Sequence, residues 1–455
     1  MRTVDSIARR AAGYASPRGA NVFVGIVLAF AFLIAIGFVL LMLPRSSASG
    51  EWTKPLIALF TAASAVSDTG LAVVNTGTHW SHFGHVIIAI LIQLGGLGFM
   101  TTTSFLLVMA GRRVTFRDFR VADALGAHNG REFVRLLLWT LGITIAVEAA
   151  GTALLAVSLR QEGAASYPWW SAIFHAVSAF NNAGFDIVGD GASLVSYANN
   201  GRVLSLIAGL SFLGALSVPV ITSLLGLLRG KGLGLDAKLA LTTTLSLVVI
   251  GTLLIFLVEL RNPASLGPMD TPVKLLNSFF TSVTARTAGF ASLDMKALML
   301  PALYIIMMLM FIGGVSGSTA GGVKVNTFAV LWLTAQSYIR GRRHVDIFRE
   351  RVPETQIHKA VAVVFFALLL VSVVALALTA TENLSFGDLA FETVSAFGTV
   401  GFSTGITSSL SVAGKLMIIF TMFVGRLGPL TVALALAESR EVAEEDVPEG
   451  EVRVG

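Results

Sequence analysis

Long apolar stretches alternate with shorter ones along the chain. Eight stretches approach or exceed the roughly 20 residues that cross a bilayer, at residues 21–43, 83–109, 133–158, 202–228, 237–260, 301–336, 359–380 and 414–437. A segment of about 12 residues lies within each successive pair, at 55–67, 168–181, 272–285 and 385–398. These segments are too short to cross, so each is predicted to dip into the membrane and return. Only the stretch at 301–336 is expected to be badly broken, because residues 313–322 are rich in glycine.

Composition places the chain in a membrane. Of 455 residues, 55% are hydrophobic and 13% are charged, which leaves too little polar surface to cover a soluble globule of this size. The absence of cysteine excludes a disulfide framework, a thiolate metal site and a cysteine nucleophile. No serine or histidine nucleophile–base spacing and no HExxH motif is present, so the sequence does not indicate an enzyme.

Basic residues gather in the loops that join one pair of spans to the next, around residues 112–135, 229–238 and 340–359. The positive-inside rule therefore predicts that these loops and both termini are cytoplasmic and that the dips enter from outside. The formal charge of +5 is spread over these short clusters rather than along one face, so nucleic acid is not an expected partner. Residues 1–18 and the Glu-rich residues 438–455 are predicted to be cytosolic tails.

A repeat of about 110 residues relates the four dips. Each has a Phe ten residues before a Gly, and a Ser lies six residues before the Gly in three of them, with Val283 as the exception. The Phe–Gly pairs are Phe60 and Gly70, Phe174 and Gly184, Phe279 and Gly289, and Phe391 and Gly401. The prediction is an all-α polytopic membrane protein with four pseudo-symmetric units around a central pore: residues 19–111, 112–229, 230–341 and 342–437.

The repeat also indicates what the pore conducts. Two spans per unit make the units parallel copies about an axis normal to the membrane, so the four dips converge. Glycine allows the backbone angles that turn successive carbonyls toward an axis, and rings of carbonyls replace the hydration shell of a cation. Pro55, Pro168 and Pro272 favour helix starts, and Ser385 is a candidate cap for the fourth. The alternative is that the four glycines are packing kinks that only end re-entrant helices.

Three motifs resemble the Trk/Ktr/HKT superfamily of potassium transporters: NNAGFD at 181–186, RTAGF at 286–290 and GGVSGSTAGGVKVNTF at 313–328. With eight spans, the chain is most similar to the bacterial KtrB-type membrane subunits. The resemblance implies a homodimer in the bacterial inner membrane, regulated by a cytosolic nucleotide-binding ring of the KtrA or TrkA type. It implies K⁺ as the transported ion, leaves Na⁺ open as an activator, and implies no organic cofactor.

The same resemblance assigns a selectivity filter, mostly of backbone carbonyls, to Ser67, Asp68, Thr69 and Gly70, to Asn181, Asn182, Ala183 and Gly184, to Arg286, Thr287, Ala288 and Gly289, and to Gly398, Thr399, Val400 and Gly401. A Ser in the first glycine position accompanies sodium preference in some plant members, so Gly70 favours potassium. Asp68 departs from the usual uncharged residue. It is expected either to pair with Arg286, the favoured hypothesis, or to hold a cation near the mouth.

The gate candidates lie in the second span of each unit. A small-residue motif recurs at 95–98, 214–217, 313–316 and 425–428, with Arg426 replacing a small residue in the fourth. Arg426 is predicted to project into the cavity below the filter as a barrier to cations, the alternative being a packing pair with a carboxylate. The broken third-unit span is predicted to form a flexible gate loop below the filter, with Gly313, Gly314, Gly317, Gly321, Gly322 and Lys324.

Glu148 and the function of the whole chain each have more than one interpretation. Glu148, inside the third span, is expected to pair with a neighbouring helix, the alternative being contact with the ion. The leading hypothesis for the whole chain is a potassium uptake subunit that passes ions down their electrochemical gradient. The alternatives are a sodium-preferring member of the same family and a coupled cation secondary transporter.

Overall fold

The computed structural model describes residues 22–98, 130–162, 168–188, 191–227, 230, 232–342 and 344–428. These residues form a mostly helical protein with one two-stranded antiparallel sheet, in which β1 (Asp346–Ile347) pairs with β2 (Glu350–Arg351). The predicted cytosolic tails, residues 1–18 and 438–455, lie outside the described residues, as do most of the 112–135 loop and the ends of the spans predicted at 83–109 and 414–437.

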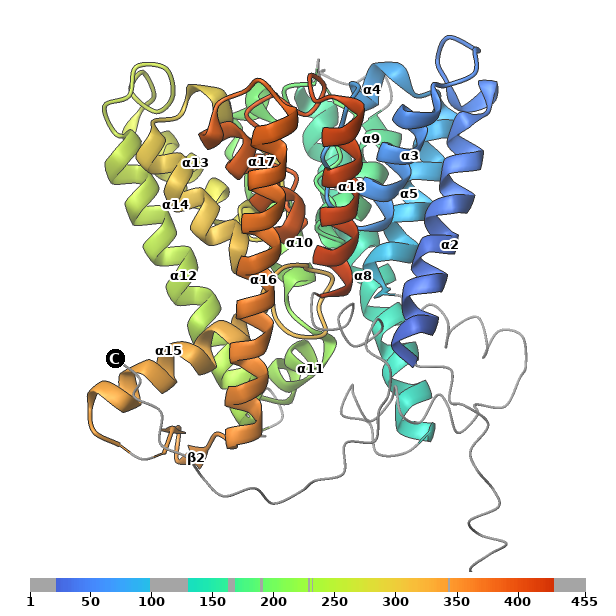
Figure 1. The fold of residues 1–455 in the computed structure, drawn as a ribbon. Helices are drawn as coiled ribbons and strands as arrows, with labels where there is room; N and C mark the ends of the chain where they lie inside the picture. The colour runs from blue at the N-terminus through green and yellow to red at the C-terminus, as the bar shows by residue number, and fades with distance from the viewer. Residues whose placement is uncertain are drawn as a thin grey trace, which may run out of the picture.

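Four long helices each precede a short one. α2 (Val22–Met42) packs on α3 (Pro55–Val66), α8 (Gly130–Glu162) on α9 (Pro168–Phe180), α12 (Leu235–Glu259) on α13 (Thr271–Thr284), and α16 (Glu354–Thr381) on α17 (Phe386–Gly398). The short helices match the predicted dips to within two residues and lie together in the upper half of Figure 1. Proline stands at the start of α3, α9 and α13, where its missing N–H is not needed, and the Ser385 hydroxyl accepts the Asp388 N–H at 3.2 Å as the predicted cap.

A second helix follows each short one: α5 (His82–Gly96), α10 (Gly201–Ala215), α14 (Leu300–Phe311) and α18 (Val412–Leu427). α14 ends at the predicted break, and the chain resumes as α15 (Val325–Ile339), which lies across the lower end of the bundle in Figure 1. The expectation that only this span is broken is wrong. α10 is followed by α11 (Val218–Leu227), and the two are bent by 104°. The reason is Pro219, because proline has no N–H to donate to the Ala215 carbonyl four residues earlier and favours the first turn of a new helix.

The remaining elements are short connections. α4 (Thr76–His79), η1 (Pro44–Ser46), η2 (Val195–Tyr197) and η3 (Met295–Ala297) lie in the loops at the end of the bundle near the short helices. Their start signals are local: the Asn75 side chain accepts the Gly77 N–H at 2.9 Å and so caps α4.

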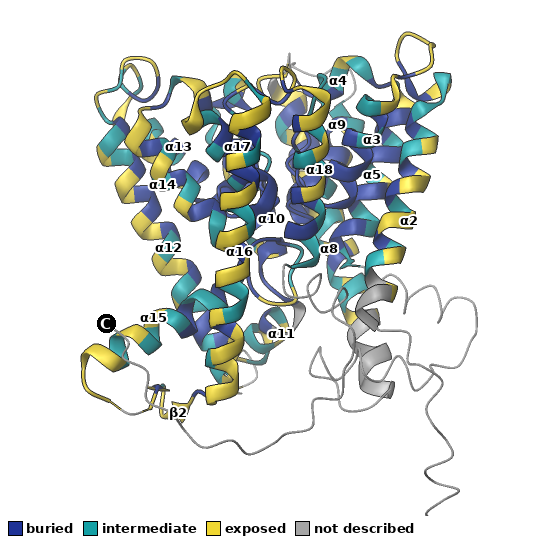
Figure 2. Cartoon of the chain, viewed as in Figure 1, coloured by how far each residue is buried: buried dark blue, intermediate teal, exposed yellow. Residues whose placement is uncertain are grey.

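Polarity in this fold is reversed relative to a water-soluble protein. Large apolar side chains are exposed along α12 and α16, including Leu253, Leu257, Phe365 and Leu376, whereas Asp68, Asn181 and Thr399 are fully buried. Figure 2 shows the exposed residues along the outer helices and the buried ones gathered toward the centre of the bundle. Among the described residues, three helices are long and apolar enough to cross a membrane, or four if the bent α10–α11 pair forms one span. A lipid-facing exterior explains the apolar surface.

Candidate functional site

Each short helix ends in a loop with the same pattern of positive φ angles. We call residues 67–70, 181–184, 286–289 and 398–401 the four glycine loops. In every loop the final glycine and the residue two positions before it have positive φ: 50° and 83° in the first, 58° and 69° in the second, 88° and 67° in the third, and 50° and 99° in the fourth. The residues in the earlier position are Asp68, Asn182, Thr287 and Thr399. The residue between these two has no positive φ, so the sign of φ alternates along each loop. This alternation turns successive peptide groups in the same direction, and it occurs in all four loops although their sequences differ.

The four glycines meet around a closed ring. A Cβ atom added to Gly70 would lie 2.5 Å from the carbonyl oxygen of Ala183, in the second loop. A Cβ added to Gly184 would lie 2.9 Å from the Ala288 carbonyl oxygen. One added to Gly289 would lie 1.8 Å from the Val400 oxygen, and one added to Gly401 would lie 2.2 Å from the Thr69 oxygen. Each loop therefore touches the next, and the fourth returns to the first. At these positions only a residue without a side chain fits, because the neighbouring backbone fills the space.

A cavity of about 550 Å³ opens on one side of this ring. All four loops contribute their glycine to its lining, together with the residues that follow each glycine. We call this cavity the vestibule. The charged residues in its lining are Asp186, Asp294 and Lys296, and hydroxyls come mainly from the segment after Gly401, namely Ser403, Thr404, Thr407 and Ser408.

The repeated Ser and Phe positions have different roles from one loop to the next. The Ser178 hydroxyl donates to the Phe185 carbonyl at 2.8 Å, and the Ser395 hydroxyl accepts the Gly401 N–H at 3.1 Å. Both bonds fasten a loop to its own short helix. Phe60, Phe174 and Phe391 are buried, but Phe279 is 40% exposed and Phe280 is buried instead. In the third dip the Phe at the repeated sequence position is therefore not the buried one, and the next residue, Phe280, is buried in its place.

The recurring small-residue motif is explained by close packing. A Cβ on Gly95, Gly214 or Gly425 would lie 2.1, 1.7 or 2.1 Å from a carbonyl oxygen at the end of the short helix in the same unit. Gly313 differs, because its Cβ would meet the Gly321 carbonyl oxygen at 2.0 Å instead. In the third unit, the 312–324 loop therefore takes the place of the short-helix end.

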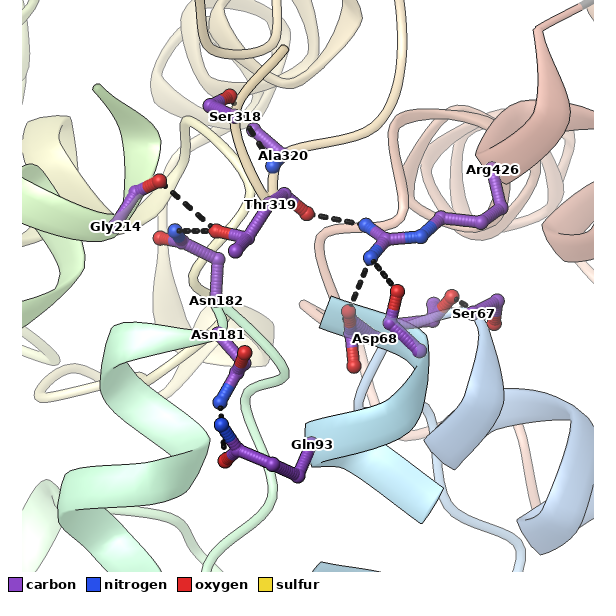
Figure 3. Close-up of polar contacts among 12 residues, drawn as sticks. Ser67, Asp68, Gln93, Asn181, Asn182, Gly214, Ser318, Thr319, Ala320 and Arg426 are labelled. Atoms are coloured by element: carbon purple, nitrogen blue, oxygen red, sulfur yellow. Dashed lines mark hydrogen bonds and ion pairs between the residues drawn. The ribbon is translucent and has the colours of Figure 1, made fainter. Parts of the chain in front are cut away.

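The 312–324 loop lies against the other side of the ring. The Gly313 N–H donates to the Val323 carbonyl at 2.8 Å and closes the loop. The Thr319 hydroxyl lies 2.9 Å from the Gly214 carbonyl and 3.0 Å from the side-chain amide of Asn182, and Val315 N–H donates to the Ala215 carbonyl at 3.0 Å. Figure 3 shows Thr319 between Asn182 and Gly214 on one side and Arg426 on the other. The loop is therefore anchored by specific bonds to the second and fourth units.

Arg426 is the centre of a buried polar cluster. Its guanidinium donates to the Thr319 and Gly95 carbonyls and forms an ion pair with Asp68, with side chains 7% and 0% exposed (Figure 3). The predicted pairing of Asp68 with Arg286 is wrong. Arg286 instead donates to the Gly313 carbonyl at 3.1 Å and the Thr244 carbonyl at 3.3 Å. Asp68 therefore pairs with Arg426 rather than Arg286, because the Arg286 guanidinium already donates to two backbone carbonyls.

The structure shows the carboxylate pairing that was the alternative for Arg426, and the predicted barrier in a cavity below the filter stays a prediction. Arg426 pairs with a carboxylate, as the packing alternative requires, and it also joins the 312–324 loop to the first unit. Lys324 bonds the Ala320 carbonyl within the loop. Glu148 pairs with a neighbouring element as expected, since it accepts the Asn181 side-chain N–H at 3.0 Å, and Gln93 accepts the same group at 3.1 Å.

Sequence reasoning missed Thr319 and the hydroxyls of the vestibule. Thr319 belongs to the glycine-rich motif, and the neighbouring glycines were the stronger signal. Ser403 and Thr407 bond Glu392, a carboxylate inside the apolar dip at 385–398, and that residue was the available signal for this part of the site.

Comparison with known proteins gives matches over nearly the whole chain. A family model described as TrkH, cation transport protein, matches residues 6–444. The chain is 40% identical to the Ktr system potassium uptake protein B of Bacillus subtilis, covering 94% of this chain and 96% of that protein. It is 39% identical to the Ktr system potassium uptake protein B of Vibrio alginolyticus, covering 90% of each.

Two further matches extend the range. The potassium/sodium uptake protein NtpJ of Enterococcus hirae is 36% identical, over 94% of this chain and 96% of that protein. The crystal structure of the potassium transporter TrkH from Vibrio parahaemolyticus superposes with a TM-score of 0.71 at 19% identity, covering 93% of this chain and 86% of that chain. At this identity the structural match shows a shared fold.

Proposed function

The chain belongs to the TrkH family of cation transport proteins, and on that premise we propose that it is the membrane-embedded, ion-translocating subunit of a potassium uptake system. The family is one of transporters rather than enzymes. The ion passes down its electrochemical gradient through a multi-pass protein of a bacterial plasma membrane. The named activities of the three relatives and the apolar exterior support this assignment.

The observation that carries the proposal is the closed ring of four glycines. Four loops that share a pattern of positive φ angles bring the Thr69, Ala183, Ala288 and Val400 carbonyl oxygens against neighbouring glycines. Carbonyl rings of this kind replace the water around a cation without adding a fixed charge that would trap it. We therefore assign the selectivity filter to the four glycine loops, and one pore unit to each of residues 19–111, 112–229, 230–341 and 342–437.

The gate is assigned to the 312–324 loop together with Arg426. The loop lies on the side of the ring opposite the vestibule and bonds the second and fourth units, while Arg426 ties it to Asp68 in the first. A glycine-rich segment held by a few hydrogen bonds can change its arrangement more easily than a helix. A cytosolic nucleotide-binding ring of the KtrA or TrkA type would move it, with two copies of this chain in the assembly.

Uptake of ⁸⁶Rb⁺ into K⁺-loaded liposomes tests this function. The proposal predicts uptake that external K⁺ inhibits and Na⁺ does not, with empty liposomes as the control. Inhibition by Na⁺ instead of K⁺ would favour the sodium-preferring alternative, for which the name of the Enterococcus hirae relative gives a reason. Uptake that neither ion inhibits, or that requires an organic solute, would contradict the potassium pore and favour a coupled secondary transporter.

A further inference from the structure

The short helix of the fourth unit carries a buried carboxylate at a position where the other three short helices have none. Glu392, on α17, is 0% exposed and stands nine residues before Gly401. The residues in the same position before the other three glycines are Thr61, His175 and Phe280. Burying a carboxylate inside a membrane protein costs free energy, so we expect Glu392 either to bind polar partners or to have a function. No basic side chain forms an ion pair with it in the described part of the chain.

Its partners are two hydroxyls of the vestibule wall. The Ser403 hydroxyl donates to Oε2 of Glu392 at 2.8 Å, and the Thr407 hydroxyl donates to Oε1 at 2.5 Å. The two hydroxyl oxygens are 3.0 Å apart, and both residues line the vestibule beyond Gly401. The carboxylate therefore holds the outer segment of the fourth unit at two points.

These bonds determine which way the hydroxyls face. A hydroxyl has one hydrogen and two lone pairs. When Ser403 and Thr407 direct their hydrogens toward the buried carboxylate, one lone pair of Ser403 accepts the Gly405 N–H at 3.0 Å, and the remaining lone pairs are left for partners in the vestibule that both residues line. Two oxygens 3.0 Å apart, each with a lone pair still available, are suitable ligands for an alkali cation, which prefers oxygen.

Other charges in the same cavity favour a cation. Asp186 and Asp294 line the vestibule and are opposed by one ammonium group, that of Lys296. Asp388, one turn before Glu392 on α17, adds another carboxylate, whose Oδ2 accepts the Ser385 hydroxyl at 2.6 Å. Two carboxylates and one ammonium group thus line the vestibule, and a second ammonium group, that of Lys415 on α18, donates to the Ser408 carbonyl at 2.9 Å.

We propose that the Ser403 and Thr407 oxygens form a binding position for a monovalent cation in the vestibule, outside the filter, and that Glu392 is the positioning residue that orients them. The position would hold K⁺ as it loses its first waters, before it reaches the ring of glycines. This inference rests on the proposed potassium uptake and adds a site to it.

Replacement of Glu392 by Gln tests the orientation. The side chain keeps its shape, but its amide nitrogen must donate to one of the two hydroxyl oxygens, so that hydroxyl turns its hydrogen away from α17. For Glu392→Gln we expect the KM for ⁸⁶Rb⁺ uptake by proteoliposomes to rise about threefold to tenfold, the factor that loss of one such contact gives, with Vmax within about twofold. Thr407→Val, which removes one oxygen and keeps the shape, is expected to raise KM by a similar factor.

Two matched controls come from the same unit. Ser409, in the same segment, donates its hydroxyl to the Ile406 carbonyl at 2.8 Å and is outside the vestibule lining, so Ser409→Ala should leave KM unchanged. Glu382 bonds the Ser411 hydroxyl at 2.5 Å and is outside the vestibule lining, so Glu382→Gln should also leave KM unchanged.

The outcomes separate this inference from the proposed function. If wild-type protein takes up ⁸⁶Rb⁺ with competition by K⁺, while Glu392→Gln and Thr407→Val keep the wild-type KM, the outer position does not exist and the pore stands. A fall in Vmax with unchanged KM would likewise overturn it, since that result shows a structural role. If Glu392→Gln yields no folded protein, Thr407→Val decides alone. Absence of K⁺-competed uptake in the wild type would contradict the proposed function itself.

Discussion

The two sides of the glycine ring are built in opposite ways. On the vestibule side, four loops with different sequences share a pattern of positive φ angles and make equivalent contacts around a ring. On the other side, the 312–324 loop has no counterpart in the other described units, and it is held by unlike side chains such as Thr319, Arg426 and Arg286. The ring is repeated, whereas the loop beneath it is unique.

The difference shows how selection and control can be separated. Selection among cations needs equivalent ligands on all sides of the ion, and backbone carbonyls supply them whatever the side chains are. Control needs one element with two arrangements, and a single loop held by a few polar contacts provides it. A change in the ring should therefore alter which ions pass, and a change in the loop should alter how readily they pass.

The largest effect is expected for Gly289→Ala. The added Cβ would lie 1.8 Å from the Val400 carbonyl oxygen, at a φ of 67° that disfavours alanine. The third and fourth loops must move apart, and ⁸⁶Rb⁺ uptake should fall to about the level of empty liposomes. Gly209→Ala on α10, where nothing lies within 4 Å, is the control and should keep wild-type uptake. Full uptake by Gly289→Ala would exclude the ring as the conduction path.

Arg426→Ala should come next, because it leaves the carboxylate of Asp68 buried without its partner. Loss of one member of a buried ion pair costs about 3–5 kcal/mol of stability. Thermal unfolding in detergent measures the loss, which Asp68→Asn in the same protein should partly reverse. Arg351→Ala breaks the exposed pair with Asp346, with side chains 59% and 51% exposed, and should cost about 0–1 kcal/mol. If Arg426→Ala and Arg351→Ala lowered stability by the same amount, the buried pair with Asp68 would contribute no more than an exposed pair.

Gly70→Ser should change selectivity more than capacity. Its Cβ would lie 2.5 Å from the Ala183 carbonyl oxygen, so that ligand shifts while the other three loops keep their contacts. We expect Na⁺ to compete for ⁸⁶Rb⁺ uptake about tenfold better than in the wild type, the result of roughly 1.4 kcal/mol less discrimination. Competition curves with Na⁺ and K⁺ measure this, and unchanged selectivity with normal uptake would contradict the filter assignment.

The smallest effect is expected for Thr319→Val, which removes the hydroxyl bonds to Gly214 and Asn182 and leaves the ring untouched. With the 312–324 loop less firmly held, uptake by the chain alone should rise about two- to fivefold, the factor for one hydrogen bond. Thr334→Val on α15, whose hydroxyl bonds Val330 within the helix at 2.7 Å, is the control. A change in K⁺ over Na⁺ preference without a change in rate would reverse the assigned roles of loop and ring.

Local signals in the sequence were sufficient for the repeated part of the molecule. Apolar length, a proline or, for α17, a serine at the N-terminus, and a following glycine placed α3, α9, α13 and α17 to within two residues. The motif glycines were found as well, although their packing against short-helix ends became visible only in the structure.

The partners in the unique part were not predictable in the same way. Asp68 and Arg426 are 358 residues apart, and nothing local distinguishes Arg426 from Arg286 as the partner. The bend between α10 and α11 was not predicted, because the length of an apolar segment does not show whether its helix is straight or bent. Pro219 was the signal that could have indicated it. The eight membrane crossings stay a prediction, since α5 and α18 run into residues outside the described part of the chain.

Anomalous diffraction from crystals soaked in Tl⁺ or Rb⁺ tests the ring of carbonyls most directly. We expect a peak at the centre of the ring, between the Thr69, Ala183, Ala288 and Val400 carbonyl oxygens, that K⁺ displaces and Na⁺ does not. Ordered loops with no peak at that centre, and a K⁺-displaceable peak elsewhere in the protein, would show that the four glycine loops are a packing device and that ions take another path.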